Sequence, residues 1–358
     1  MNAEYQNHFR ITGMANALPE KIISNADFSE RFPGTDIDSF LKMAGISERR
    51  VVSPGQAASD LAVCAAERLF SEMKIDRKEI DTLIFCSQTG DYQTPATACI
   101  LQARLGLSSR TCTFDAVQAC PSFIHMLGIV KGLLAGSVAR KVLLIHAEAF
   151  SKIIHPYDRG LVPLHGDGAS VFLFERSDSD PLGIDWTAYG TDGSQFERIC
   201  IPDGKGRSPF TENSLKEIKD DSGNIRTPVH LKMDGAAVFH FAIHTVPKFV
   251  KEVCAEHEKS LDDFDLVLFH QANKIIVDML YNMLKIPAEK RYMYLEKVGN
   301  LSGVSLPFML IEAVREKKIV PGQKILLAGF GGGMSWGAAA LTWQNGNCVL
   351  APTSILPR

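Results

Sequence analysis

The stretch that decides the fold is residues 113–136, TFDAVQACPSFIHMLGIVKGLLAG. It opens with a short apolar run typical of a buried strand, and the segment from Cys120 to Ala135 is apolar on nearly every face of a helix. A helix without a polar face has to be packed on all sides. The stretch therefore predicts a strand followed by a central helix, with Cys120 and Pro121 at the first helical turn.

The strands around this unit occur in two similar sets. In each half of the chain, three buried strands follow one another at intervals of about thirty residues. They are centred on Leu83, Thr113 and Val142, and again on Leu266, Tyr294 and Ile325. This spacing is typical of a strand-helix unit, and it predicts two copies of one α/β module, each with a largely parallel sheet covered by helices. We place the halves at residues 1–180 and 181–358.

The expected elements come from apolar, β-branched runs for strands and from longer apolar segments of helical period for helices. Expected strands cover residues 82–86, 112–114, 141–146, 169–175, 266–270, 293–296, 324–328 and 338–343. Expected helices cover residues 96–105, 120–135, 235–256, 274–284 and 304–315. Residues 177–230 are polar and rich in Asp, Ser and Gly, so they are expected to form surface loops and a binding lip.

The composition of the chain argues against several classes of function. Of 358 residues, 46% are hydrophobic and the net charge is −3, so no general positive field is available to hold nucleic acid or an anionic membrane. The N-terminal sequence is polar and the apolar runs are too short to cross a bilayer, so a cytoplasmic protein is expected. The eight cysteines include no CxxC pair and lie mostly in apolar stretches, which is typical of reduced core thiols.

Three chemically capable residues follow expected strands, at the carboxyl ends where ligands of α/β proteins collect. Cys120 stands at a helix N-terminus, whose unpaired N–H groups favour a thiolate, so we expect this thiol to ionise easily. His270, in DLVLFHQAN, can exchange protons near neutral pH. Asn300, in EKVGNLSGVSLP, can donate a hydrogen bond to an oxyanion. Position alone leaves open a core thiol, a core histidine and an N-cap asparagine.

The glycine run at residues 329–333, GFGGG, lets backbone N–H groups approach a ligand closely. A dinucleotide-binding fingerprint is the obvious rival, but Met334 takes the place of its third glycine and the next element is expected to be a strand. His240 and His244 share a helix face without the glutamate of a zinc protease. A second His/Asp group is attributed to a tight turn; it comprises His155, Asp158, His165 and Asp167. Neither a metal nor a redox cofactor is expected.

Together these residues resemble the β-ketoacyl-acyl carrier protein synthase III family of the thiolase-like superfamily, over nearly the whole chain. The shared motifs are GI-x-ER at 45–49, Cys120 ahead of its helix, DRG at 158–160, GDGA at 166–169, HQAN at 270–273, GN-x-S at 299–302 and FGGG-x-x-WG at 330–337. Each motif is short, but their joint order is specific. The resemblance implies an α/β fold of five layers, αβαβα, made of two duplicated halves and assembled as a homodimer.

By this resemblance the chain is an acyltransferase that performs decarboxylative condensation. Cys120 would attack acyl-coenzyme A or an acyl carrier protein thioester, with the N–H groups of Cys120 and Gly332 holding the oxyanion. Malonyl-acyl carrier protein would then lose carbon dioxide, and His270 and Asn300 would hold the enolate. The substrate-binding residues that the resemblance implies are Thr94, Arg159, Lys274, Phe330 and Gly331.

The sequence departs from the family at positions that contact the substrate. Ser39 and Met43 stand where a Trp and an Arg commonly help to hold the coenzyme A nucleotide, and Arg159 alone keeps that pattern. Thr94 stands where a large aromatic often lines the partner's acyl pocket, which favours a longer or bulkier acyl group than acetyl. The basic residue after HQAN is displaced, because Lys274 and Ile275 stand where the family often has an apolar residue and then Arg. Fatty-acid, polyketide and specialised-lipid pathways stay open, as do transfer to an oxygen or nitrogen acceptor and a noncatalytic partner subunit.

Overall fold

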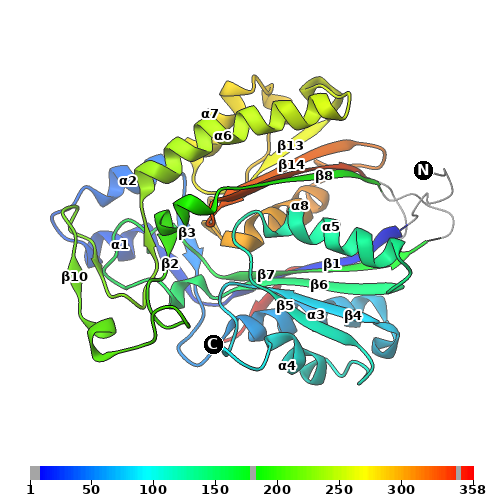
Figure 1. Ribbon diagram of the computed structural model, residues 1–358, viewed down its shortest axis with the longest axis horizontal. Coiled ribbons are helices and arrows are strands. Elements are labelled where there is room, and N and C mark those ends of the chain that lie inside the picture. The colour runs from blue at the N-terminus through cyan, green and yellow to red at the C-terminus, as the bar shows by residue number, and fades with distance from the viewer. Residues whose placement is uncertain (1–8, 178–182, 344–347) are drawn as a thin grey trace.

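The computed structural model describes residues 9–177, 183–343 and 348–358, and within them two sheets alternate with three layers of helices. In Figure 1, α3 and α4 lie below the first sheet, α5 and α8 lie between the two sheets, and α6 and α7 lie above the second sheet. The five-layer αβαβα arrangement expected from the sequence is therefore confirmed.

The first sheet has the strand order β16-β1-β7-β6-β4-β5, and β17 also pairs with β1. Its strands are β1 (Phe9–Pro19), β4 (Thr82–Cys86), β5 (Cys112–Ala116), β6 (Lys141–Glu148), β7 (Gly168–Arg176), β16 (Val349–Leu350) and β17 (Ser354–Leu356). Strands β4, β5 and β6 are parallel, whereas β7 runs antiparallel to both β6 and β1. Because β16 and β17 pair with β1, the last strands of the chain return to the first sheet. The division at residue 180 stays a prediction.

The second sheet has the order β13-β14-β15-β8. Its strands are β8 (Gly183–Thr191), β13 (Leu266–Phe269), β14 (Lys324–Gly331) and β15 (Ser335–Thr342). Only β13 and β14 run parallel. The expectation of a largely parallel sheet was therefore wrong for this second sheet, because β14 and β15 are joined by a tight turn, which makes them antiparallel.

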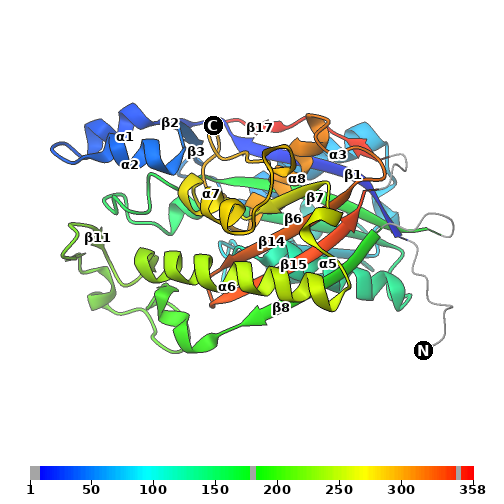
Figure 2. The ribbon, with the colours of Figure 1, turned by 90° about the horizontal axis from the view of Figure 1, so that it is seen from above.

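The helices cover the faces of the two sheets, except α1 and α2, which pack against each other beside them. They are α1 (Asn25–Arg31), α2 (Ile37–Ala44), α3 (Ala58–Met73), α4 (Thr97–Arg104), α5 (Ser122–Ala135), α6 (Gly235–Glu256), α7 (Lys274–Met283) and α8 (Ser305–Arg315). Figure 2 shows α6 lying over the second sheet. Short strands complete the described fold: β2 (Ile22–Ser24), β3 (Glu48–Arg50), β9 (Ile199–Cys200), β10 (Ile218–Lys219), β11 (Ile225–Arg226) and β12 (Lys232–Met233).

Strand β6 shows why its sheet lies between helices on both faces. Val142 and Leu144 point into the core shared with α5 and α8, whereas Leu143 and Ile145 point into the core shared with α3 and α4. Successive side chains of a strand face opposite sides, so a strand that is apolar at every position needs a packed layer on each side. The uniform apolar run at residues 142–145 is thus a direct consequence of the layered fold.

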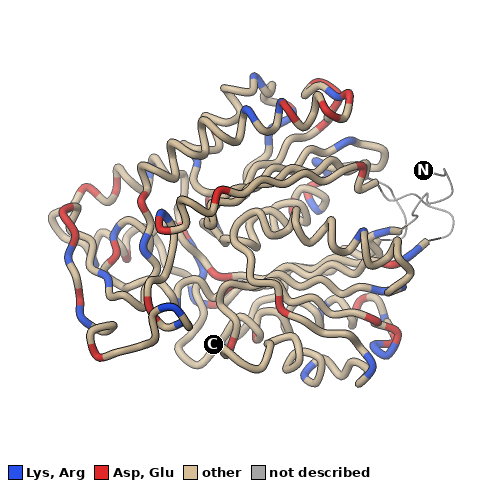
Figure 3. The backbone as a smooth tube through the Cα atoms, in the orientation of Figure 1, with Lys and Arg blue, Asp and Glu red and all other residues tan. Residues whose placement is uncertain are grey.

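Charged residues lie mainly on the outer helices and on loops, as Figure 3 shows, while the central helices and the strands carry few of them. This distribution leaves few charged residues in the central layer, and a polar group buried there needs a hydrogen-bond partner. Among the described helices, each is too short or too polar to span a bilayer.

Two of the expected elements were wrong. Residues 293–296 form no regular strand, because the N–H of Tyr294 donates to the side chain of Gln271 at 3.1 Å and so is not available to a neighbouring strand. Residues 183–191, expected to be loop, form β8. This strand lies at the edge of its sheet and is only partly buried, so its sequence lacks a strong apolar pattern.

Candidate active site

The two halves of the chain meet at one cavity of about 580 Å³. Its lining includes six of the site residues expected from the sequence: Cys120, His270, Asn300, Phe330, Gly331 and Gly332. The structure therefore brings together residues that lie 150 or more positions apart in the chain. Hydrophobic side chains such as Phe150 and Phe239 make up much of the remaining wall.

Cys120 lies between the end of β5 and the first turn of α5. That turn begins with the N–H of Ser122 donating to the carbonyl of Ala119 at 2.9 Å. The turn packs directly against β14, where a Cβ added to Gly331 would lie 2.8 Å from Cys120 Sγ. A Cβ added to Gly329 would lie 2.8 Å from Cα of Pro121. The glycines are needed here because the helix start and the strand approach too closely for a side chain.

The environment of the Cys120 sulfur raises its pKa to about 11. Burial is the main cause, and the carboxylate of Glu148 adds to it. A hydrogen bond with Ser302 and the backbone N–H groups of Cys120 and Gly332 act in the opposite direction. The expectation that this thiol ionises easily is not supported, because burial raises the pKa of Cys120 more than its hydrogen bonds lower it.

His270 directly follows β13 and is 2% exposed. Its backbone N–H donates to the carbonyl of Ala328 at 2.9 Å, and its ring stands edge-on to Phe330 with the ring centroids 5.6 Å apart. Burial, with a smaller contribution from His165, lowers the pKa of His270 to about 3. The expected proton exchange near neutral pH is not supported, because the imidazole is neutral there.

Asn300 is held on both sides by backbone hydrogen bonds. Its N–H donates to the carbonyl of Leu164 at 2.8 Å, and its carbonyl accepts from Gly166 at 3.1 Å. The side-chain oxygen accepts from the N–H of Ser302 at 2.8 Å, so the side-chain NH₂ group is the free end of the amide. That group makes only a long contact of 3.4 Å with the carbonyl of Ala272. A ligand oxygen can therefore compete for it.

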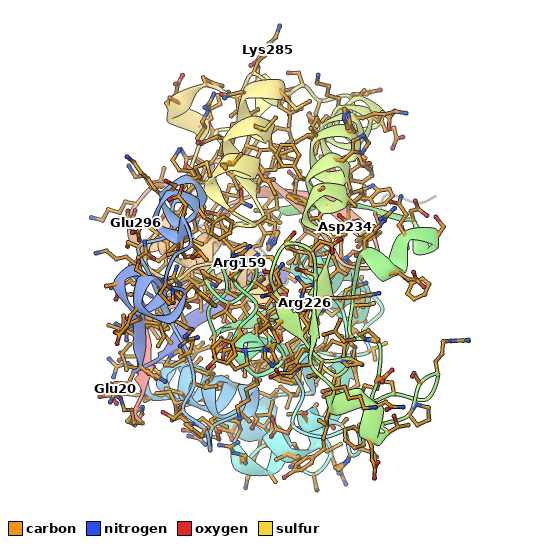
Figure 4. All side chains as sticks on the ribbon, turned by 90° about the vertical axis from the view of Figure 1, so that its left-hand side faces the viewer. Glu20, Arg159, Arg226, Asp234, Lys285 and Glu296 are labelled. Atoms are coloured by element: carbon orange, nitrogen blue, oxygen red, sulfur yellow. The ribbon has the colours of Figure 1, made fainter. Side chains whose placement is uncertain are left out.

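The remaining residues expected to bind substrate lie outside the lining of this cavity. Thr94 is exposed, and Lys274 forms an ion pair with Asp278 on α7. Arg159 donates to the carbonyl of Ser222, in the turn between β10 and β11. Figure 4 shows Arg159 on the same face of the molecule as Arg226 and Asp234, two residues of the cavity wall. The roles expected for Thr94, Lys274 and Arg159 stay predictions.

The hairpin of β10 and β11 forms part of the cavity wall, and no sequence motif singled out its individual residues. Asp220, Ser222, Asn224 and Arg226 all line the cavity. Arg226 forms ion pairs with Asp158, which is fully buried, and with Asp220 at 3.2 Å. Residues 220–226 belong to the polar stretch 177–230 that was expected to form a binding lip, and that role stays a prediction, whereas the pairing of Arg226 with Asp158 has no local sequence signal.

The histidine and aspartate groups considered as metal ligands have protein neighbours instead. His240 and His244 lie with ring centroids 4.2 Å apart on the exposed face of α6. In the other group, each of His155, Asp158, His165 and Asp167 contacts a protein partner. Within the described ranges, no cluster of three or more His, Cys, Asp or Glu residues could hold a metal ion.

Comparison with known proteins identifies the family of the chain that forms this site. The family model described as 3-Oxoacyl-[acyl-carrier-protein (ACP)] synthase III matches residues 114–193, which include Cys120. The model described as 3-Oxoacyl-[acyl-carrier-protein (ACP)] synthase III C terminal matches residues 254–343, which include His270 and Asn300.

Individual relatives extend this match over most of the chain. The β-ketoacyl-[acyl-carrier-protein] synthase III of Rhodopirellula baltica is 34% identical, over 93% of this chain and 98% of the relative. A crystal structure of a 3-oxoacyl-(acyl-carrier-protein) synthase III has a TM-score of 0.90 at 32% identity, over 94% of this chain and 100% of the other. The priming β-ketosynthase of the R1128 polyketide pathway has a TM-score of 0.81 at 26% identity, over 96% of this chain and 99% of the other. The chain therefore belongs to the 3-oxoacyl-[acyl-carrier-protein] synthase III family of condensing enzymes.

Proposed function

We propose that this protein condenses an acyl group held on Cys120 with a malonyl thioester, with loss of carbon dioxide. The observation that carries the proposal is the convergence of Cys120, His270 and Asn300 on one cavity. These side chains are a nucleophile and two hydrogen-bond donors, the groups that this chemistry requires.

In the first step, the Cys120 sulfur attacks the carbonyl carbon of acyl-coenzyme A or of an acyl carrier protein thioester. The new sulfur–carbon bond replaces the bond to the departing thiol, and the proton of Cys120 ends on that thiol. The backbone N–H groups of Cys120 and Gly332 hold the oxyanion of the tetrahedral intermediate. Their position supports this role, since both already lower the pKa of the neighbouring sulfur.

In the second step, malonyl-acyl carrier protein loses carbon dioxide, and the released electron pair forms an enolate. His270 and Asn300 donate hydrogen bonds to the enolate oxygen, and the enolate carbon displaces the Cys120 sulfur from the acyl group. A pKa near 3 supports the donor role of His270, because a neutral imidazole keeps one N–H to donate. Neither step calls for a metal or a redox cofactor.

We further propose that the protein works as a homodimer. The exposed position of Thr94 supports its predicted role in the acyl pocket of the partner subunit and not in its own cavity. The edge strand β5 and the neighbouring Val117, which is 80% exposed, offer an apolar surface for such an assembly. The cytoplasmic location expected from the sequence stays a prediction.

The proposal is tested by intact-mass spectrometry and by carbon dioxide release. After incubation with acyl-coenzyme A, we expect a single thioester adduct that Cys120→Ala abolishes and Cys64→Ala retains. Cys64 is a suitable control because it is a half-buried cysteine of α3. An adduct that persists in Cys120→Ala would refute the assignment. Carbon dioxide release from malonyl thioester separates condensation from transfer to an oxygen or nitrogen acceptor, and turnover by the purified homodimer excludes a noncatalytic partner subunit.

A further inference from the structure

A hydrogen-bonded chain of residues outside the proposed catalytic set ends at the Cys120 sulfur. Ser302 Oγ lies 3.9 Å from Cys120 Sγ and donates to Gln88 Oε1 at 2.8 Å. Ser302 is 1% exposed and follows Cys120 by 182 residues in the sequence. Its contact with the sulfur is therefore made by the tertiary fold and not by local sequence.

Glu148 fixes the turn that carries Gln88. Its carboxylate, at the end of β6, accepts hydrogen bonds from the N–H of Gln88 at 2.9 Å and from the hydroxyl of Thr89 at 2.6 Å. The Ser87 hydroxyl adds a longer contact at 3.4 Å, and Thr89 Oγ1 accepts from the N–H of Ala149 at 2.9 Å. Because one carboxylate accepts hydrogen bonds from several groups of the same turn, it holds the backbone of Gln88 in place, and with it the base of the Gln88 side chain.

The chemistry of these groups sets the direction of the hydrogen bonds. An amide oxygen only accepts, so the Ser302 hydroxyl gives its one proton to Gln88. The lone pairs of the Ser302 oxygen then face Cys120 and can accept a hydrogen bond from the thiol. Once the sulfur is negative, the hydroxyl can rotate and donate to it, which lowers the pKa of Cys120. A hydroxyl suits both states because it is a donor and an acceptor.

Among the described residues of the cavity wall, no unpaired cation is available to stabilise the Cys120 thiolate. The titratable groups that line the cavity with Cys120 are His165, Asp220, Arg226, Asp234 and His270. Burial lowers the pKa of His165 to about 4 and that of His270 to about 3, so both are neutral. Arg226 is already paired with two carboxylates, and Glu148 raises the pKa of Cys120. Uncharged hydrogen bonds therefore have to support the thiolate.

We propose that Ser302 is the hydrogen-bond partner that orients and activates the Cys120 sulfur, and that Gln88, held by Glu148, positions Ser302. The inference rests on the proposed function for its role in acylation, but it concerns a property of the thiol that can be measured with no acyl substrate. During acylation the thiol proton still ends on the departing thiol, so Ser302 keeps its own proton.

The test is the rate at which iodoacetamide alkylates Cys120 between pH 6 and pH 10. Peptide mass spectrometry separates Cys120 from the exposed Cys99 and Cys112. Ser302→Ala is expected to slow alkylation at pH 8 about tenfold and to move the profile to higher pH, because one hydrogen bond to the thiolate is lost. The matched control is Ser170→Ala, since Ser170 is also buried and donates to an amide oxygen, that of Asn16, at 2.7 Å. A Ser302→Ala profile that superimposes on those of wild type and control would overturn the proposal.

A double-mutant cycle tests the part assigned to Gln88. Gln88→Ala is expected to speed alkylation by about threefold to tenfold in the wild-type background and to leave it unchanged in the Ser302→Ala background, because Gln88 acts through Ser302 by holding the one hydroxyl proton that the thiolate would otherwise accept. Fully additive effects would refute this positioning role. Should Ser302→Ala fail to fold, Ser302→Gly makes the same comparison, since Ser302 has a φ of +51° that glycine adopts without strain.

Condensation activity, measured on the same samples, keeps the two proposals apart. An unchanged alkylation profile in a protein that releases carbon dioxide from malonyl thioester would refute the role of Ser302 alone. A shifted profile in a protein that never condenses would refute the proposed function alone.

Discussion

Replacing Gly331 with alanine should disable Cys120 without altering any reacting group. Gly331 ends β14 and packs on the start of α5, where the new Cβ would lie 2.8 Å from Sγ and 2.9 Å from Cβ of Cys120. Non-bonded carbon atoms are normally about 3.5–4.0 Å apart, so the strand and the helix start would have to separate by roughly 0.7 Å or more. Neither atom belongs to the flexible end of a long side chain, so the backbone has to move.

The expected magnitude follows from this overlap. Overpacking in a core typically costs about 1–3 kcal/mol, and a misplacement of about 1 Å at a reacting centre costs about 100-fold in rate. We therefore expect Gly331→Ala to lower the free energy of unfolding by about 2 kcal/mol, measured in urea, and to slow acylation of Cys120 about 100-fold, measured by intact-mass spectrometry.

Gly132→Ala is the matched control for this variant. Gly132 is exposed on α5, and an added Cβ there would meet nothing within 4 Å. Alanine at a helical glycine stabilises by roughly 0.5–1 kcal/mol, so the control should acylate at the wild-type rate and unfold at slightly higher urea. Wild-type acylation and an unchanged urea midpoint in Gly331→Ala would refute the packing argument.

The remaining predictions concern the two donors and the buried carboxylate. His270→Ala and Asn300→Ala should each retain acylation of Cys120 but lower carbon dioxide release from malonyl thioester by about two to three orders of magnitude, because one donor to the enolate is lost; a loss of acylation equal to the loss of decarboxylation would contradict the separate roles. Glu148→Gln should change how stability depends on pH. Burial raises the pKa of Glu148 from 4.5 to about 7, so its contribution to stability is present at low pH and is lost as pH rises toward 7. The free energy of unfolding of wild type, relative to Glu148→Gln, should therefore fall by about 2–3 kcal/mol between pH 5 and pH 8 in urea titrations, and a constant difference would show that Glu148 is charged at both pH values.

Some strands and helices were predictable because their signals are local, whereas β1 and α3 were not among the expected elements. The apolar run of β4 and the amphipathic repeat of α6 gave the bounds that the structure has, Thr82–Cys86 and Gly235–Glu256. Strand β8 was missed because an edge strand is covered on fewer sides and carries fewer apolar residues. The direction of neighbouring strands could not be predicted either, since pairing depends on which segments meet in space.

The candidate site was predictable in its membership but not in its electrostatics. Cys120, His270 and Asn300 each follow a strand or its equivalent, so their meeting at one cavity follows from the duplicated topology. The expectation of an easily ionised thiol considered only the helix N-terminus, which is a local feature. Its pKa is raised instead by the atoms that surround it after folding.

The sequence by itself therefore determined which segments are buried and which side chains have the chemistry for acyl transfer. Those properties depend on residue type and on short-range periodicity, which are written along the chain. Only the tertiary structure decided that burial raises the pKa of Cys120, that Arg159 contacts the turn between β10 and β11, and that Ser302 lies beside the sulfur. Desolvation and hydrogen bonding depend on atoms brought together across 182 residues of sequence, and no local pattern records such a contact.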